Sequence, residues 1–147
     1  MRLWRVSRHH DLTGKGGLHT SARWHTSGAP IVYLAESAPG ALLEVCVHTS
    51  LEDAPPTYTL MEVAVEEPVS VESVDVTSLP PYWVSRPEVT QTIGTGWLKS
   101  GRSALLRVPS ALAPQTTNVL LNPLHPDARL ARVVDVWEYP FDLRIKA

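Results

Sequence analysis

The sequence predicts a single mixed α+β domain that has a mostly antiparallel β core and a few helices. Many short, β-branched or alternating apolar runs are typical of strands, whereas only two segments show clear helical spacing. The repeating strand–helix–strand rhythm of a doubly wound parallel sheet is missing. The 147 residues fit one domain, which we expect to span residues 1–147 because no linker or internal repeat divides them.

The first half of the chain is expected to form strands around one helix. A polar loop that carries three glycines is predicted over residues 9–20. Ser37 is placed as a helix cap two residues before Pro39, and apolar residues then recur at helical spacing to about His48. The strands of this half are predicted at residues 3–7, 30–35, 58–65 and 69–76. We expect the last two of these strands to pair side by side.

The second half is expected to begin with the longer helix. Ser85 and Glu88 match the S-x-x-E pattern of a capping box, and Pro87 suits the first helical position, so a helix is predicted from Pro87 to about Ser100. Gly101 is expected to end it. Three more strands are predicted at residues 104–108, 118–122 and 133–139.

Composition excludes several classes of function. Thirteen basic and fifteen acidic residues give a net charge of −2, which provides no general attraction for nucleic acid, so no direct nucleic-acid binding is expected. The single Cys46 permits neither an internal disulfide nor paired-cysteine zinc binding, and is expected to be a small buried side chain in a reducing compartment. Because no signal sequence and no apolar run of about 20 residues is present, we expect a cytoplasmic protein without a membrane span.

The familiar local motifs of metal and nucleotide sites are also missing. The six histidines follow no metal-ligand spacing, so no metal is expected. Neither a glycine-rich Rossmann or P-loop cradle nor a serine-hydrolase elbow occurs in the chain.

Two residues near the glycine-bearing loop are candidates for ligand binding. Arg23 precedes Trp24, an arrangement in which a guanidinium group meets phosphate oxygens or a ribose edge beside an aromatic wall. The alternative is a surface arginine next to a core tryptophan. Tyr33 lies in the most hydrophobic strand, where its ring either stacks on a planar ligand or is an ordinary core side chain.

Two further polar residues stand among apolar neighbours. Glu44 is bracketed by apolar residues within the predicted helix, and a glutamate is rarely buried unless it is paired. It either points to solvent or lines a pocket, where its carboxylate would stabilise a cationic sugar transition state. Ser110 follows Pro109 at the end of a strand and is either a site residue or a turn and cap residue.

Taken together, these segments resemble a RES-domain toxin, a family named for its arginine, glutamate and serine. The resemblance covers nearly the whole chain. It is carried by residues 3–6, 22–28, 31–35, 41–45 with His48, 105–110, 118–123, 125–126 and 141–144. One departure is local: the family commonly has G-G-R-W-N where this chain has Ser21-Ala22-Arg23-Trp24-His25.

The resemblance implies a compact fold similar to ADP-ribosyltransferases that acts on NAD⁺ as its substrate without a metal. Arg23, Glu44 and Ser110 match the three residues of the family name, and Tyr33 matches the aromatic residue of the following strand. We expect Arg23 to anchor phosphates or ribose, Tyr33 to stack on nicotinamide, Glu44 to stabilise the oxocarbenium-like ribose, and Ser110 to orient a ribose or amide group. Arg5 and His48 lie beside motifs and are further binding candidates.

The expected activity is cleavage of the nicotinamide–ribose bond, which depletes NAD⁺ by hydrolysis or phosphorolysis. The first alternative is transfer of ADP-ribose to a host protein, and a non-catalytic interaction module is the alternative from another class. The resemblance also implies an Xre-type helix-turn-helix antitoxin as partner. Whether the chain forms a homo-oligomer or a toxin–antitoxin hetero-oligomer is left open.

Overall fold

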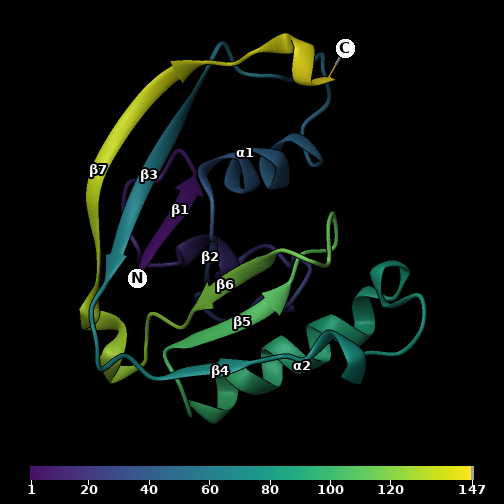
Figure 1. Ribbon diagram of the computed structural model, residues 1–147, viewed down its shortest axis with the longest axis vertical. Coiled ribbons are helices and arrows are strands. Elements are labelled where there is room, and N and C mark those ends of the chain that lie inside the picture. Colours follow the sequence, from purple (N-terminus) through teal and green to yellow (C-terminus); the bar gives the residue numbers. More distant parts are fainter. Residues whose placement is uncertain (147) are drawn as a thin grey trace.

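The computed structural model describes residues 1–146, and it is organised around a strongly bent seven-stranded sheet (Figure 1). The strands are β1 (Arg2–Val6), β2 (Val32–Ala35), β3 (Thr57–Val65), β4 (Val71–Ser73), β5 (Leu105–Pro109), β6 (Thr117–Leu121) and β7 (Ala131–Pro140). Their order is β4-β5-β6-β2-β1-β3-β7, and every neighbouring pair is antiparallel except β4 and β5. The expected α+β class with a mixed, mostly antiparallel sheet is confirmed.

Two α-helices and several short 3₁₀ turns complete the fold over these residues. The α-helices are α1 (Ala38–Cys46) and α2 (Pro87–Ser100), and the 3₁₀ turns are η1 (Lys15–Leu18), η2 (Val76–Ser78), η3 (Trp83–Ser85), η4 (Pro126–Leu130) and η5 (Leu143–Lys146). In Figure 1, β3 and β7 form a long curved ribbon along the left side, while α2 lies at the bottom of the view, below β5. No helix within residues 1–146 is long and apolar enough to cross a membrane.

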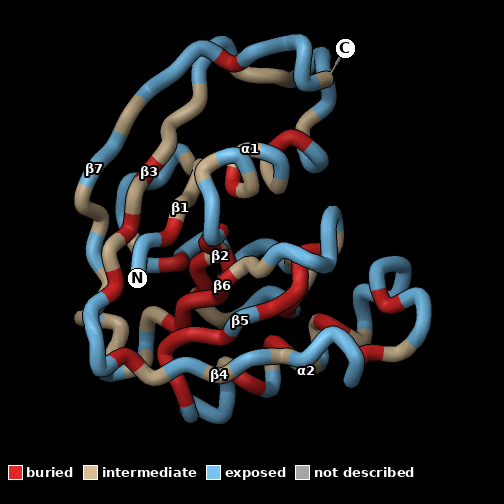
Figure 2. The backbone as a smooth tube through the Cα atoms, viewed as in Figure 1, coloured by how far each residue is buried: buried red, intermediate tan, exposed pale blue. Residues whose placement is uncertain are grey.

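The centre of the sheet is buried on both faces, and Figure 2 shows this as the buried band along β5 and β6. Because successive side chains of a strand point to opposite faces, Leu105 packs in one apolar cluster and Leu106 in another. The first cluster joins Leu3, Val32 and Val63 of the central strands. The second gathers tryptophans 24, 83 and 97, so α2 and η3 cover that face of the sheet.

Helix α1 begins as the sequence predicts. Ser37 is extended and caps the helix, and its hydroxyl oxygen accepts a hydrogen bond of 3.1 Å from the Gly40 backbone N–H. The helix packs against β1 and β2 and ends at Cys46, two residues before the predicted end. Cys46 is a buried free thiol, as its helical position suggested. Lys146 Nζ donates 2.6 Å to the Cys46 carbonyl oxygen, which ties η5 to the end of α1.

Helix α2 has the predicted bounds but not the predicted cap. The residue that precedes it is Arg86, which makes no side-chain cap hydrogen bond. Ser85 is instead the last residue of η3, and its hydroxyl donates to the Tyr82 carbonyl oxygen, so the capping box is wrong. Glu88 pairs with the Arg86 guanidinium at 3.2 Å. Gly101 ends the helix in the left-handed region with φ 62°, which glycine adopts without strain.

The predicted strand over residues 69–76 is the other correction. Only Val71–Ser73 is a strand, and it pairs in parallel with β5 rather than with β3. The physical reason is that both edges of β3 are already occupied, one by β1 and the other by β7. The segment therefore crosses to the far edge of the sheet, where β5 offers free backbone groups.

Candidate active site

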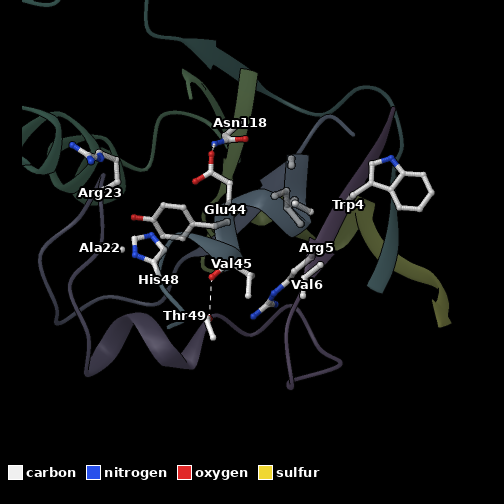
Figure 3. Close-up of a pocket in the computed structure, with 14 residues that line it drawn as sticks. Trp4, Arg5, Val6, Ala22, Arg23, Glu44, Val45, His48, Thr49 and Asn118 are labelled. Atoms are coloured by element: carbon white, nitrogen blue, oxygen red, sulfur yellow. Dashed lines mark hydrogen bonds between the residues drawn. The ribbon is translucent and has the colours of Figure 1, made fainter. Parts of the chain in front are cut away.

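A cavity of about 300 Å³ opens between α1, the strands β1 and β2, and the segment that carries Arg23 (Figure 3). Its lining includes five of the six predicted site residues, and a sixth polar side chain is new. These residues are Arg5, Arg23, Tyr33, Glu44, His48 and Asn118. The arginine and the glutamate, 21 positions apart in sequence, thus share one cavity.

Glu44 projects from the middle of α1, and its carboxylate is held by two donors. Ser110 Oγ donates to Glu44 Oε1 at 2.9 Å, and Asn118 Nδ2 donates to the same oxygen at 2.8 Å. In Figure 3 one carboxylate oxygen meets Asn118 and the other points toward the side of the cavity where Arg23 lies. Two hydrogen bonds to a single carboxylate oxygen fix its orientation and leave the group half-buried at the cavity wall.

The two donors come from one hairpin. Ser110 follows β5 and Asn118 belongs to β6, and the antiparallel pairing of Val108 with Asn118 brings both side chains to the same end of the sheet. Ser110 is only 4% exposed, and its oxygen also accepts from the Leu112 N–H at 3.1 Å. It therefore lies behind Glu44 and is not part of the described cavity lining.

Asn118 is the residue that sequence reasoning missed. The sequence predicts it at the start of a strand and gives it no role, although two features indicate its place beside Ser110. It is a polar residue at the head of the apolar run Val119-Leu120-Leu121, and a tight antiparallel connection from Ser110 returns the chain to the same edge. A hairpin prediction for residues 104–122 would have placed the two side chains together.

Arg23 is presented by a short segment that α2 holds from behind. Thr90 Oγ1 donates to the Arg23 carbonyl oxygen, and Gln91 Nε2 donates to the Ala22 carbonyl oxygen at 3.0 Å. The guanidinium group itself donates through Nη1 to the Val84 carbonyl oxygen, so its remaining N–H groups are available to a ligand. We expect Trp24 from the sequence to line the same site, but it is 2% exposed and packs in the cluster beneath α2.

Tyr33 lines the cavity with its ring, while its hydroxyl group is turned to the protein. The hydroxyl oxygen accepts from the Trp24 N–H at 3.1 Å and lies 2.8 Å from His25 Nδ1. Burial raises the pKa of Tyr33 well above its ordinary value, opposed by the Trp24 hydrogen bond and the nearby Arg23 charge. The phenol is therefore neutral at physiological pH, and it offers an aromatic face to a ligand.

Arg5 and His48 complete the polar side of the cavity. Arg5 donates through Nη1 to the Asp11 carbonyl oxygen at 2.7 Å and through Nη2 to Ser7 Oγ at 3.3 Å. Burial lowers the pKa of Arg5, partly offset by the Asp11 charge, but a guanidinium group stays protonated. His48 lies past the end of α1 and is exposed at the cavity rim. Over residues 1–146, no group of three or more potential ligands is arranged to hold a metal ion.

Comparison with known proteins decides the family. The model of the RES domain matches residues 2–142. The chain belongs to the RES-domain toxin family. This RES domain is 47% identical over 135 residues to a protein named Toxin Res from Pseudomonas putida, covering 90% of this chain and 92% of that protein. It is 41% identical over 135 residues to a protein named Prs ADP-ribosylating toxin from Sphingobium, covering 88% and 84% respectively.

The fold of this RES domain also occurs in a solved structure. The crystal structure of the M. tuberculosis MbcT–MbcA toxin–antitoxin complex aligns with a TM-score of 0.73 over 99% of this chain and 86% of that chain. The sequence identity is 17%, so the likeness concerns the fold alone.

Proposed function

We propose that this RES domain is an enzyme that cleaves the nicotinamide–ribose bond of NAD⁺ and thereby depletes the cofactor in the cell. The observation that carries the proposal is the clamped carboxylate of Glu44, which shares one cavity with the Arg23 guanidinium and the Tyr33 ring. An anion, a cation and an aromatic face suit the three parts of a nicotinamide ribosyl phosphate.

The chemistry requires little beyond these groups. Nicotinamide carries a positive charge while it is bound to ribose and leaves as a neutral molecule, so the C1′–N bond breaks without a general acid. The positive charge passes to the ribose, which becomes oxocarbenium-like, and the Glu44 carboxylate stabilises it. Ser110 and Asn118 hold that carboxylate in place, so it is already oriented when the charge develops.

Arg23 and Tyr33 position the substrate in this proposal. The free N–H groups of Arg23 bind the phosphates or the adjoining ribose, and the ring of Tyr33 stacks on nicotinamide. Arg5, whose guanidinium is fixed at the same cavity, supplies a second cation for the diphosphate. His48 lies at the rim, where it contacts the part of the dinucleotide that leaves the cavity.

Transfer of ADP-ribose to a protein is the second candidate. A specific observation favours it: the 41% identical relative is named Prs ADP-ribosylating toxin. Water, inorganic phosphate and a protein side chain are all acceptors for the same ribosyl cation. The first bond broken is the same in each reaction, so the roles of Arg23, Tyr33 and Glu44 do not change.

Release of nicotinamide from NAD⁺ by the purified protein tests the proposal. Glu44→Gln keeps the shape and removes the charge, and we expect it to lower kcat by about 100-fold or more. Glu52→Gln is the matched control, because Glu52 is an exposed glutamate outside the cavity lining. No release by the wild type would favour the non-catalytic interaction module, and equal release by Glu44→Gln would show that the Glu44 carboxylate does not carry the reaction.

The acceptor is identified by repeating the assay under three conditions. Reactions without phosphate yield ADP-ribose if water is the acceptor, whereas added phosphate yields ADP-ribose 1″-phosphate if the enzyme is a phosphorylase. Labelled NAD⁺ with host protein shows label on a protein band if the enzyme is a transferase.

We also propose an antitoxin partner with an Xre-type helix-turn-helix region, in the cytoplasm where NAD⁺ is abundant. The solved structure with the same fold is a toxin–antitoxin complex, which supports such a partner. The net charge of −2 on this chain agrees with DNA contacts that come from the antitoxin. Expression of the chain alone is expected to arrest growth and co-expression to relieve the arrest; harmless expression of soluble wild type contradicts the toxin role.

A further inference from the structure

His25 is a buried polar residue that the proposed chemistry does not use. It is 1% exposed, and its imidazole stands 2.8 Å from the Tyr33 hydroxyl through Nδ1. On the other side of the ring, Nε2 is buried, and no described residue forms a hydrogen bond to it. A buried histidine with one nitrogen directed at a cavity residue calls for an explanation.

The neighbouring groups determine which nitrogen carries the proton. Nε2 faces the backbone of Gly17, where a Cβ added at that glycine would lie 3.2 Å from it. Burial opposes the charged form and lowers the pKa of His25, so the ring is neutral and holds one proton. We infer that this proton lies on Nε2, because the Tyr33 hydroxyl oxygen already accepts from the Trp24 N–H and Nδ1 can then accept the hydroxyl proton.

The direction of the next hydrogen bond then follows. In this tautomer the Tyr33 hydroxyl oxygen accepts from the Trp24 N–H, and the hydroxyl donates its own proton to His25 Nδ1. The three groups form a chain in which Tyr33 both accepts and donates. In this arrangement the hydroxyl proton is used within the protein and is not offered to a ligand.

We propose that His25 is a positioning residue for substrate binding, which acts by fixing the Tyr33 ring against the cavity. This inference rests on the proposed NAD⁺ activity for its kinetic consequence. A tyrosine side chain turns about two bonds, and two hydrogen bonds at its hydroxyl group fix where the far end of the ring lies. The ring is then ready to stack before the ligand arrives, which favours binding.

His25 stands where the resembled family commonly has asparagine, in Ser21-Ala22-Arg23-Trp24-His25. An asparagine side chain places a polar atom close to where Nδ1 of a histidine lies. Both residue types can therefore accept a proton from the same tyrosine.

Three variants separate positioning from simple packing. His25→Leu keeps most of the volume and removes the acceptor, and we expect kcat/KM for NAD⁺ to fall by about threefold to tenfold, mainly through KM. His25→Asn retains an acceptor and is expected to restore most of this loss. Tyr33→Phe removes the same hydrogen bond from the other side. The double variant with Tyr33→Phe and His25→Leu is therefore expected to have a kcat/KM no lower than that of the less active single variant.

A spectroscopic measurement on the ligand-free protein makes the test independent of catalysis. Long-range ¹H–¹⁵N NMR spectra of the imidazole are expected to show His25 protonated at Nε2 and unprotonated at Nδ1, and Tyr33→Phe is expected to shift the Nδ1 signal. A protonated Nδ1, an unchanged KM in His25→Leu, or a His25→Asn variant as impaired as His25→Leu overturns the inference. Failure of the wild type to cleave NAD⁺ removes the proposed function instead, while the NMR result still decides whether His25 holds Tyr33.

Discussion

Replacing Gly94 with alanine tests how helix α2 supports the segment that presents Arg23. Gly94 is buried against Trp24, and a Cβ added there would lie 1.7 Å from the Trp24 carbonyl oxygen, although real contacts of this kind are not shorter than 3.0 Å. The helix and the segment must therefore move apart. Thr90 and Gln91 of the same helix hold this segment, so their hydrogen bonds to it stretch as well.

The magnitude follows from two opposing effects. Overpacking in a buried contact costs about 1–3 kcal/mol, and this backbone clash belongs at the upper end of that range. Alanine gains about 1 kcal/mol over glycine in a helix interior. We expect Gly94→Ala to lower the free energy of unfolding by about 2 kcal/mol, which lowers Tm by roughly 4–8 °C.

Gly96→Ala in the same helix is the matched control. Gly96 is exposed, and an added Cβ would meet nothing within 4 Å, so only the gain in helix propensity applies. We expect this variant to be more stable than the wild type by about 0.5–1 kcal/mol. Urea denaturation followed by tryptophan fluorescence measures both variants. If Gly94→Ala is as stable as Gly96→Ala, the close contact between α2 and Trp24 does not exist and the reasoning is refuted.

Three other predictions concern the site and its surroundings. Each of two variants, Ser110→Ala and Asn118→Ala, removes a charge-assisted hydrogen bond to Glu44. We expect each variant to slow nicotinamide release by about 10-fold to 100-fold. Wild-type rates in both variants would show that these two hydrogen bonds are not needed. Burial keeps the pKa of His25 in the folded protein below its usual value of 6.5, so the unfolded chain binds the extra proton at a higher pH than the folded chain does. The free energy of unfolding is therefore expected to fall as the pH decreases through about 6.5. Urea denaturation at several pH values should show a shallower fall in His25→Asn. Burial also raises the pKa of the Cys46 thiol, so a thiol reagent is expected to react slowly with the native protein and rapidly in urea, whereas equal rates would place Cys46 at the surface.

Local patterns in the sequence were sufficient for elements whose signal is local. The cap at Ser37, the end of α2 at Gly101 and the apolar runs of β2, β5 and β6 depend on residues within a few positions, and the structure contains them. These features are decided by side-chain hydrogen bonding, backbone freedom and period-two burial.

Strand partners depend on competition along the whole chain. The strand that ends at Ser73 could not be assigned to β5 from its own residues, because its exclusion from β3 follows from the pairing of β7, some 60 positions later. The false capping box at Ser85 has a similar cause. The serine hydroxyl is bound within the 3₁₀ turn around Trp83, and Trp83 packs against Trp24 at a ring distance of 6.1 Å, a contact that residues 85–88 do not reveal.

The candidate site also combines features that nearby residues reveal with features that depend on distant partners. The resemblance drew attention to Arg23, Glu44 and Ser110, but their spacing does not reveal that Ser110 reaches the cavity only through the carboxylate. That relation depends on the depth of Ser110 below the surface, and depth is a property of packing. Asn118 was overlooked for the related reason that its importance comes from its partner across the hairpin.

The connection between β5 and β6 is a convenient place to insert foreign peptide. Ladder pairs from Leu105–Leu121 to Pro109–Thr117 set the position of the two donors, whereas Ala113, Pro114 and Gln115 at the tip are exposed. An epitope or a fluorescent label introduced between Pro114 and Gln115 would therefore report on the protein in cells while the carboxylate keeps both of its anchors.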